Sequence, residues 1–141
     1  MRARFRFSEV VKKVGCIPGY YEIWTLKGVL LKVGVAADLC KRLTQHGESL
    51  QRGLKGFNGK TSWVNPSKVR SKRSILAKHL YFDSSIAPGY DLRREADRQK
   101  FLEQDCRICF KPMVSRAAAR EYERERERTA CIRYVGRVIK C

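Results

Sequence analysis

Long apolar runs are missing from this chain of 141 residues. A helix that crosses a membrane needs about 20 consecutive apolar residues, whereas the longest runs here, such as 28–31, are only as long as a strand. The basic N-terminus also lacks the apolar segment of a secretory signal, because charged residues follow directly within 9–13. We therefore expect a protein without a membrane partner that works in the cytoplasm.

Acidic residues are scarce as well. The sequence has 14 Asp and Glu against 31 Lys and Arg, which leaves a formal net charge of +17. Such an excess must be solvated, paired or matched by a polyanion. A nucleic acid is the natural polyanionic partner, while a solubility surface or a ribosome-bound protein would show the same charge.

Cysteines are few and scattered. The six of them stand in a chain with 43% hydrophobic residues, enough for a core, unlike the dense cysteines of small secreted domains. We expect reduced thiols. Cys106 and Cys109 have the spacing of half a zinc site, but no second pair matches it, so buried thiols are favoured. With this length and no internal repeat, 1–141 is expected to form a single domain.

The first half of the chain shows the clearest pattern of secondary structure. Two short runs rich in β-branched and aromatic residues, 20–24 and 29–35, are separated by a Lys-Gly pair and predict an antiparallel hairpin. Asp38 is a plausible N-cap for the helix that follows, and Gly47 supplies a stop signal about three turns later.

Residues 48–74 form a basic, glycine-containing insert with interleaved aromatic residues. Such mixtures often bind nucleic acid, because cations meet phosphates and rings stack on bases. An irregular connection with its aromatic residues in the core fits the pattern equally well. The candidate nucleic-acid-binding residues, in the insert and on the helix before it, are Lys41, Arg52, Lys55, Lys60, Trp63, Lys68, Arg70, Lys72 and Arg73.

The remaining elements complete a small α/β (α+β) fold. Residues 75–83 predict a third strand, although the first of them could instead finish a helix. An approximately helical spacing runs through 92–106 toward Pro112. Ser115 opens a last helix, 116–128, whose alternating Glu and Arg form ion pairs on a solvated face, and 132–139 predict a closing strand. We expect an antiparallel or mixed three-stranded sheet flanked by helices, with a C-terminal helix and strand extension.

Several short motifs follow one another along the first half of the chain at defined spacings. Gly19-Tyr20-Tyr21 is followed, eleven residues after Tyr21, by Lys32-Val33-Gly34. Arg42 and His46 come eight and twelve residues after the last glycine, so they project from one face of the predicted helix. This pattern resembles the GIY and YIG half-motifs, and the helix that follows them, in the GIY-YIG endonuclease family.

A later segment extends the resemblance. Leu102-Glu103 precedes Pro112 by nine residues, similar to the Leu-Glu and Lys-Pro elements of the family. The family's asparagine after this segment is absent, and Ser115 is the candidate for its place. The resemblance covers about 17–47 and 96–114 of a core that spans about 17–114, and it leaves the insert and the extension 115–141 outside.

The resemblance implies a metal-dependent nuclease. Tyr21 would accept a proton from the attacking water, Arg42 would hold the scissile phosphate, and His46 would assist by hydrogen bonding or proton transfer. Glu103 would bind one Mg²⁺ or Mn²⁺ ion, which keeps most of its waters. Lys32 stands where the family usually has a tyrosine. Its ammonium would favour the Tyr21 phenolate or relay a proton, unless it is a surface lysine directed at DNA or solvent.

The leading hypothesis is therefore a DNA endonuclease that hydrolyses phosphodiester bonds. The alternative is a nucleic-acid-binding module that has kept the fold and lost the catalytic activity. Lys32 and the absent asparagine are the observations that favour it. A third hypothesis, motivated by small size and high charge, is a toxin-like nuclease held in check by an acidic inhibitor. We expect a monomer or a weak dimer, with specificity set by the insert, the tail or a partner.

Overall fold

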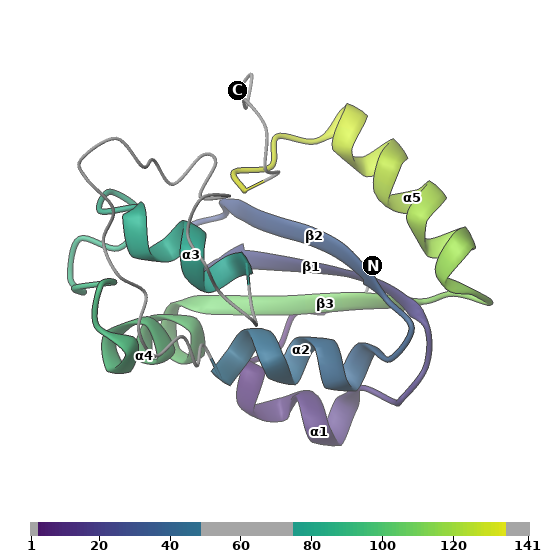
Figure 1. Ribbon diagram of the computed structural model, residues 1–141, viewed down its shortest axis with the longest axis horizontal. Coiled ribbons are helices and arrows are strands. Elements are labelled where there is room, and N and C mark those ends of the chain that lie inside the picture. Colours follow the sequence, from purple (N-terminus) through teal and green to yellow (C-terminus); the bar gives the residue numbers. More distant parts are fainter. Residues whose placement is uncertain (1–2, 49–74, 135–141) are drawn as a thin grey trace.

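The computed structural model describes residues 3–48 and 75–134. In this part of the chain, a three-stranded antiparallel sheet has the order β2-β1-β3. The central strand β1 (Gly19–Thr25) lies between β2 (Leu30–Ala36) and β3 (Cys106–Pro112), and helices cover the sheet (Figure 1). The predicted α+β class, a small antiparallel sheet flanked by helices, is confirmed.

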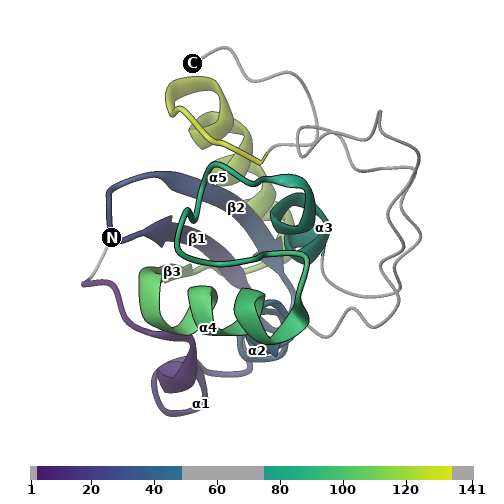
Figure 2. The same ribbon diagram turned by 90° about the vertical axis from the view of Figure 1, so that its left-hand side faces the viewer.

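The helices are divided between the two faces of the sheet. The C-terminal helix α5 lies on one side, and α1, α2 and α4 lie on the other, as both views show (Figures 1 and 2). The bounds are η1 (Phe7–Glu9), α1 (Val10–Lys13), α2 (Leu39–Glu48), α3 (Ile75–Phe82), α4 (Glu95–Asp105) and α5 (Arg116–Thr129). The two faces therefore meet different sets of side chains.

The predicted hairpin and the helix after it are confirmed. Gly28 has a φ of +91° in the turn between β1 and β2, a conformation that glycine adopts without strain. Asp38 caps α2, because its carboxylate accepts a hydrogen bond from the Lys41 amide at 3.0 Å. Gly47, however, lies inside α2 and does not end it. A side chain there would come within 2.8 Å of the Phe7 ring, so this glycine serves close packing.

The prediction of a third strand at 75–83 is wrong. These residues form α3, whose buried Leu76 and Leu80 are four apart, as on one face of a helix. The third strand is instead β3, and α4 ends at Asp105 before it. Cys106 and Cys109 therefore stand on a strand and not in the preceding helix. His79, expected on a strand, lies on α3 and stacks on Tyr134.

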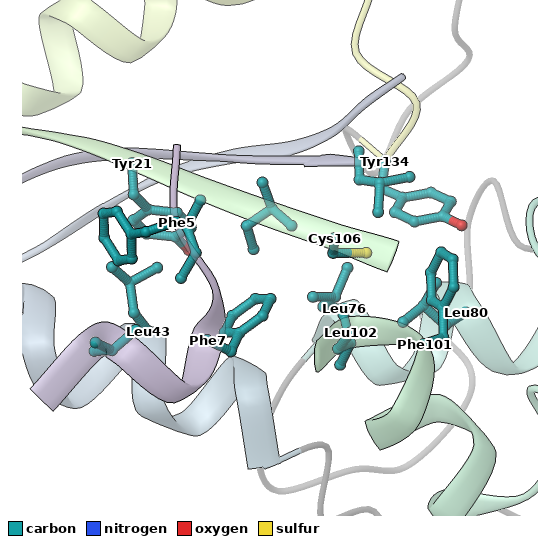
Figure 3. Packing of buried hydrophobic residues seen from close by; sticks show 14 of the residues in the cluster. Phe5, Phe7, Tyr21, Leu43, Leu76, Leu80, Phe101, Leu102, Cys106 and Tyr134 are labelled. Carbon is teal, nitrogen blue, oxygen red and sulfur yellow. The ribbon is translucent and has the colours of Figure 1, made fainter. Parts of the chain in front are cut away.

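The buried side chains form two clusters. The larger lies between the sheet and the helices α2, α3 and α4, and it joins residues from segments far apart in the sequence, including Phe5, Tyr21, Leu43, Leu80 and Leu102 (Figure 3). The smaller cluster lies on the α5 side of the sheet and contains Tyr20, Leu30, Val33, Ala119 and Ile132. The thin second cluster leaves α5 with few apolar contacts.

The C-terminal extension begins as predicted. The Ser115 hydroxyl accepts a hydrogen bond from the Ala118 amide at 3.1 Å and caps α5. The predicted closing strand at 132–139 is not formed in its described part, 132–134, although the amides of Arg133 and Tyr134 donate to backbone carbonyls of β2 at 2.9 and 2.8 Å. Residues 135–139 lie outside the described ranges.

The buried carboxylate of Asp83, directly after α3, forms hydrogen bonds with residues of the C-terminal extension. Asp83 is fully buried, and Arg133 donates to both of its oxygens, at 2.7 and 3.0 Å. The Tyr134 hydroxyl and the Ser85 hydroxyl also donate to it, at 2.6 and 2.9 Å. Burial alone would raise the pKa of Asp83, but these hydrogen bonds hold it below its ordinary value. The carboxylate is therefore ionised and saturated with donors.

The described cysteines differ in state. Cys16, Cys40, Cys106 and Cys109 form no disulfide, as predicted, whereas Cys131 forms a disulfide that the sequence did not predict. Cys106 and Cys109 are buried, as expected for buried thiols. Across the described ranges, no helix has the length and apolar character needed to cross a membrane.

Candidate active site

Tyr21 occupies the centre of the candidate site. It stands on β1 on the side of the sheet that α2 covers, with 1% of its surface exposed. Its hydroxyl oxygen lies 2.8 Å from Nε2 of His46, which is likewise buried. The i,i+4 spacing of Arg42 and His46 on α2 brings both side chains to this phenol. The predicted convergence of Tyr21, Arg42 and His46 is therefore present.

Two glycines of the motifs make room for this arrangement. Gly34 pairs with Tyr21 across β1 and β2, and a Cβ atom there would lie 2.3 Å from the Tyr21 hydroxyl and 2.4 Å from Cζ. At Gly19, a Cβ atom would lie 2.5 Å from the Lys111 carbonyl oxygen and 2.6 Å from the Leu39 side chain. Each position thus requires glycine, because the Cβ atom of any other residue would overlap neighbouring atoms. Gly34 in particular lets the Tyr21 ring lie flat against the neighbouring strand.

Lys32 lies on the same face of the sheet as Tyr21. Its Cα pairs with that of Ile23, and the alternation of side chains in a strand places Lys32 with Tyr21, Ile23 and Gly34. Burial and, to a smaller extent, the Arg42 guanidinium lower the pKa of Lys32 to about 8, although the charges of two glutamates oppose them. Lys32 therefore exchanges its proton close to neutral pH.

Burial also controls the protonation of the other two groups. It raises the pKa of Tyr21 to about 12, although the Arg42 guanidinium beside the phenol opposes this effect. It lowers the pKa of His46 well below the ordinary value, and the charges of Lys32 and Arg42 lower it further. At neutral pH the hydrogen bond thus joins a neutral phenol to a neutral imidazole.

Glu103 does not join these residues. It stands on α4, where its carboxylate accepts a hydrogen bond from the Ser8 amide at 3.0 Å. It lines a surface hollow together with Thr44, Gly47 and Glu48 of α2. At about 100° per residue, Thr44 lies roughly 200° around the helix from Arg42. Glu103 and Arg42 therefore face different sides of α2.

The carboxylate whose charge acts on the cluster is that of Glu123 on α5. Its charge acts on both Tyr21 and Lys32, and Glu127, one helical turn later, acts on Lys32 as well. Burial and the charge of Glu127 raise the pKa of Glu123, while Lys32 lowers it. Sequence reasoning missed both residues, because the Glu-Arg alternation of α5 has the appearance of a solvated face. Their i,i+4 spacing was the one available signal.

Few of the predicted nucleic-acid-binding residues fall in the described ranges. Lys41 is exposed on α2, next to Arg42 in the chain. The other eight residues, including Trp63, belong to the insert and lie outside the described residues. Their assignment stays a prediction.

Comparisons with known proteins do not place this chain in a family. No family model, no curated protein and no solved structure matches it.

The neutral imidazole of His46 leads to a prediction about acid stability. In the unfolded chain, this histidine binds a proton below pH about 6.5, whereas in the fold it stays neutral to a much lower pH. Its contribution to stability is thus complete above pH about 6.5 and is lost as the pH falls, by up to about 1.4 kcal/mol per pH unit. We expect His46→Gln to flatten this slope between pH 7 and 5, measured by urea unfolding at each pH. Equal slopes in the variant and the wild type would contradict the prediction.

Proposed function

We propose that this protein is a DNA endonuclease that hydrolyses phosphodiester bonds at the cluster of Tyr21, Lys32, Arg42 and His46. The observation that carries the proposal is the buried hydrogen bond between Tyr21 and a neutral His46, with two cationic side chains beside it. Hydrolysis of a phosphodiester needs a base for the attacking water and positive charge at the phosphate. These four side chains supply both, and the net charge of +17 favours a polyanionic substrate.

The hydrogen bond supports a relay of protons. With Nε2 of neutral His46 as acceptor, the phenol of Tyr21 takes a proton from water and passes its own proton to the imidazole, whose positive charge the negative charge of the bound phosphate stabilises. The hydroxide formed in this way attacks phosphorus, and the bond to the leaving oxygen breaks. Arg42 neutralises the charge that develops on the phosphate, and Lys32, with a pKa of about 8, supplies a proton to the leaving oxygen.

The requirement for Mg²⁺ or Mn²⁺ belongs to the same proposal. Glu103 does not fit the role that the resemblance implies, since it faces away from Arg42. Glu123, with Glu127 one helical turn away, fits better, because the charge of Glu127 raises the cost of ionising Glu123 and a cation relieves it. Among the described residues there is no group of three or more His, Cys, Asp or Glu arranged for a metal, but Mg²⁺ needs only one or two carboxylates. When bound, the ion supplies further positive charge to the phosphate.

Nicking of supercoiled plasmid with Mg²⁺ or Mn²⁺ tests the function and the choice of carboxylate together. We expect the wild type to nick DNA, Glu123→Gln to lose about 100-fold or more in rate, and the matched control Glu103→Gln to stay within a few-fold. Binding to the same DNA, measured by fluorescence anisotropy, should remain in all three proteins. If Glu103→Gln lost the activity and Glu123→Gln kept it, Glu103 would be the carboxylate that binds the metal ion. A wild type that is inactive on plasmid, branched and single-stranded DNA would refute the nuclease.

One observation favours a second candidate, a nucleic-acid-binding module without catalysis. Burial keeps the Tyr21 phenol protonated at neutral pH, which makes it a weak base unless His46 accepts its proton. In such a module, Arg42→Ala and Glu123→Gln would change DNA affinity and its salt dependence, and no protein of the series would cleave.

A further inference from the structure

The helix that carries Glu123 has an unusually thin apolar face. Ala119 is the one fully buried residue of α5, and Tyr122 packs edge-on against Tyr20 with ring centroids 4.7 Å apart. A helix on a sheet is ordinarily held by a broad stripe of buried apolar side chains. Burial therefore fixes the rotation and position of α5 only weakly.

A buried carboxylate, that of Glu22, gives α5 the fixed contact with the sheet that its thin apolar face does not provide. Glu22 stands on β1 on the α5 side of the sheet and is 4% exposed. Its oxygens accept hydrogen bonds from the Tyr20 hydroxyl at 2.6 Å, from Trp24 Nε1 at 3.0 Å and from Arg126 Nε at 2.7 Å. The Cys109 thiol adds a longer contact of 3.8 Å. Tyr20, Trp24 and Cys109 belong to the sheet, so Arg126 is the member that reaches it from α5.

The position of Arg126 on α5 links this network to the candidate site. Arg126 follows Glu123 by three residues and precedes Glu127 by one. A rotation of α5 by a single residue, about 100°, would turn both glutamates away from Lys32. Arg126 donates a hydrogen bond to a carboxylate oxygen of Glu22, and Glu22 stands on the central strand β1. This contact therefore holds α5 in one rotation about its own axis.

We propose that Glu22 is a positioning residue, which holds Arg126 and thereby fixes the rotation of α5, the helix that carries Glu123 and Glu127. Its role in cleavage rests on the proposed function, whereas its control of α5 does not. The Glu22 carboxylate suits this task, because Tyr20 and Trp24 of the sheet each donate to one of its two oxygens and fix their positions independently of Arg126. Although burial would raise the pKa of Glu22, the hydrogen bonds of Tyr20, Arg126 and Trp24 bring it below the ordinary value.

Hydrogen exchange of backbone amides tests the placement of α5 without reference to activity. In Glu22→Gln and Arg126→Gln we expect the amides of α5 to lose about tenfold or more in protection, while those of β1 and β3 keep theirs. Arg126→Lys should restore part of it. Arg128→Gln is the matched control, because Arg128 stands on the same helix and pairs with exposed Glu125. Unchanged protection of α5, or an equal loss throughout the sheet, would overturn the proposal.

Cleavage kinetics give the second readout. We expect kcat to fall about tenfold in Arg126→Gln, with KM for DNA changed less than threefold and partial recovery in Arg126→Lys. A change in KM alone would count against a positioning role. If Glu22→Gln proves too unstable, the Arg126 variants carry the test, since Arg126 is partly exposed. Loosening of α5 in a protein that never cleaves DNA would support the inference and refute the nuclease.

Discussion

Replacing Tyr21 by phenylalanine is expected to lower the rate of DNA cleavage by about 100-fold or more. The ring would still pack against Gly34, so the change removes only the hydroxyl that contacts His46 Nε2. The lost hydrogen bond should reduce stability by about 1 kcal/mol, too little to unfold the protein. Single-turnover cleavage measured beside the melting temperature separates the two effects.

Tyr90→Phe is the control for this change. The Tyr90 hydroxyl forms an exposed hydrogen bond to Gln104 at 3.3 Å, away from the candidate site. Cleavage by this variant should equal that of the wild type. If Tyr21→Phe also cleaved at the rate of the wild type, Tyr21 would have no part in activating water, and the relay through His46 would have to be abandoned.

The largest loss of stability is expected from Asp83→Ala. This change leaves the Arg133 guanidinium and the buried Tyr134 hydroxyl without their shared acceptor. Removing one partner of a buried ion pair costs about 3 kcal/mol or more, which is a large part of the stability of a domain of this size. Chemical denaturation followed by circular dichroism would measure the change.

The control for Asp83→Ala is Asp91→Ala. Asp91 is exposed and accepts a hydrogen bond from the Arg93 amide at 3.2 Å. We expect this variant to lose no more than about 1 kcal/mol. Similar losses in the two variants would mean that the Asp83 network contributes little beyond an ordinary surface contact.

Much of the N-terminal half could be predicted from the sequence, because short-range rules determine it. Two runs rich in β-branched and aromatic residues, on either side of a Lys-Gly pair, predict the hairpin that the structure contains. The i,i+4 spacing on α2 brought Arg42 and His46 together, and the N-caps Asp38 and Ser115 were recognised by residue type.

The rest depends on contacts between distant segments. Residues 75–83 and 106–112 are both short and apolar, and only pairing with β1 decides that the second segment is the strand. The choice between Glu103 and Glu123 depends on where α4 and α5 lie relative to Lys32 and Tyr21, and no local pattern contains that information. The Glu22–Arg126 and Asp83–Arg133 pairs join residues 104 and 50 positions apart.

The late position of α5 has a consequence for synthesis of the chain. Tyr21, Lys32, Arg42 and His46 all lie before the insert, whereas the acidic side chains beside them arrive after the last strand of the sheet. A nascent chain that has emerged only as far as β3 would therefore hold the charges of Lys32 and Arg42 without the glutamates of α5 that oppose them. In the proposed nuclease, the carboxylates that would hold the metal ion are thus the last part of the site to be synthesised.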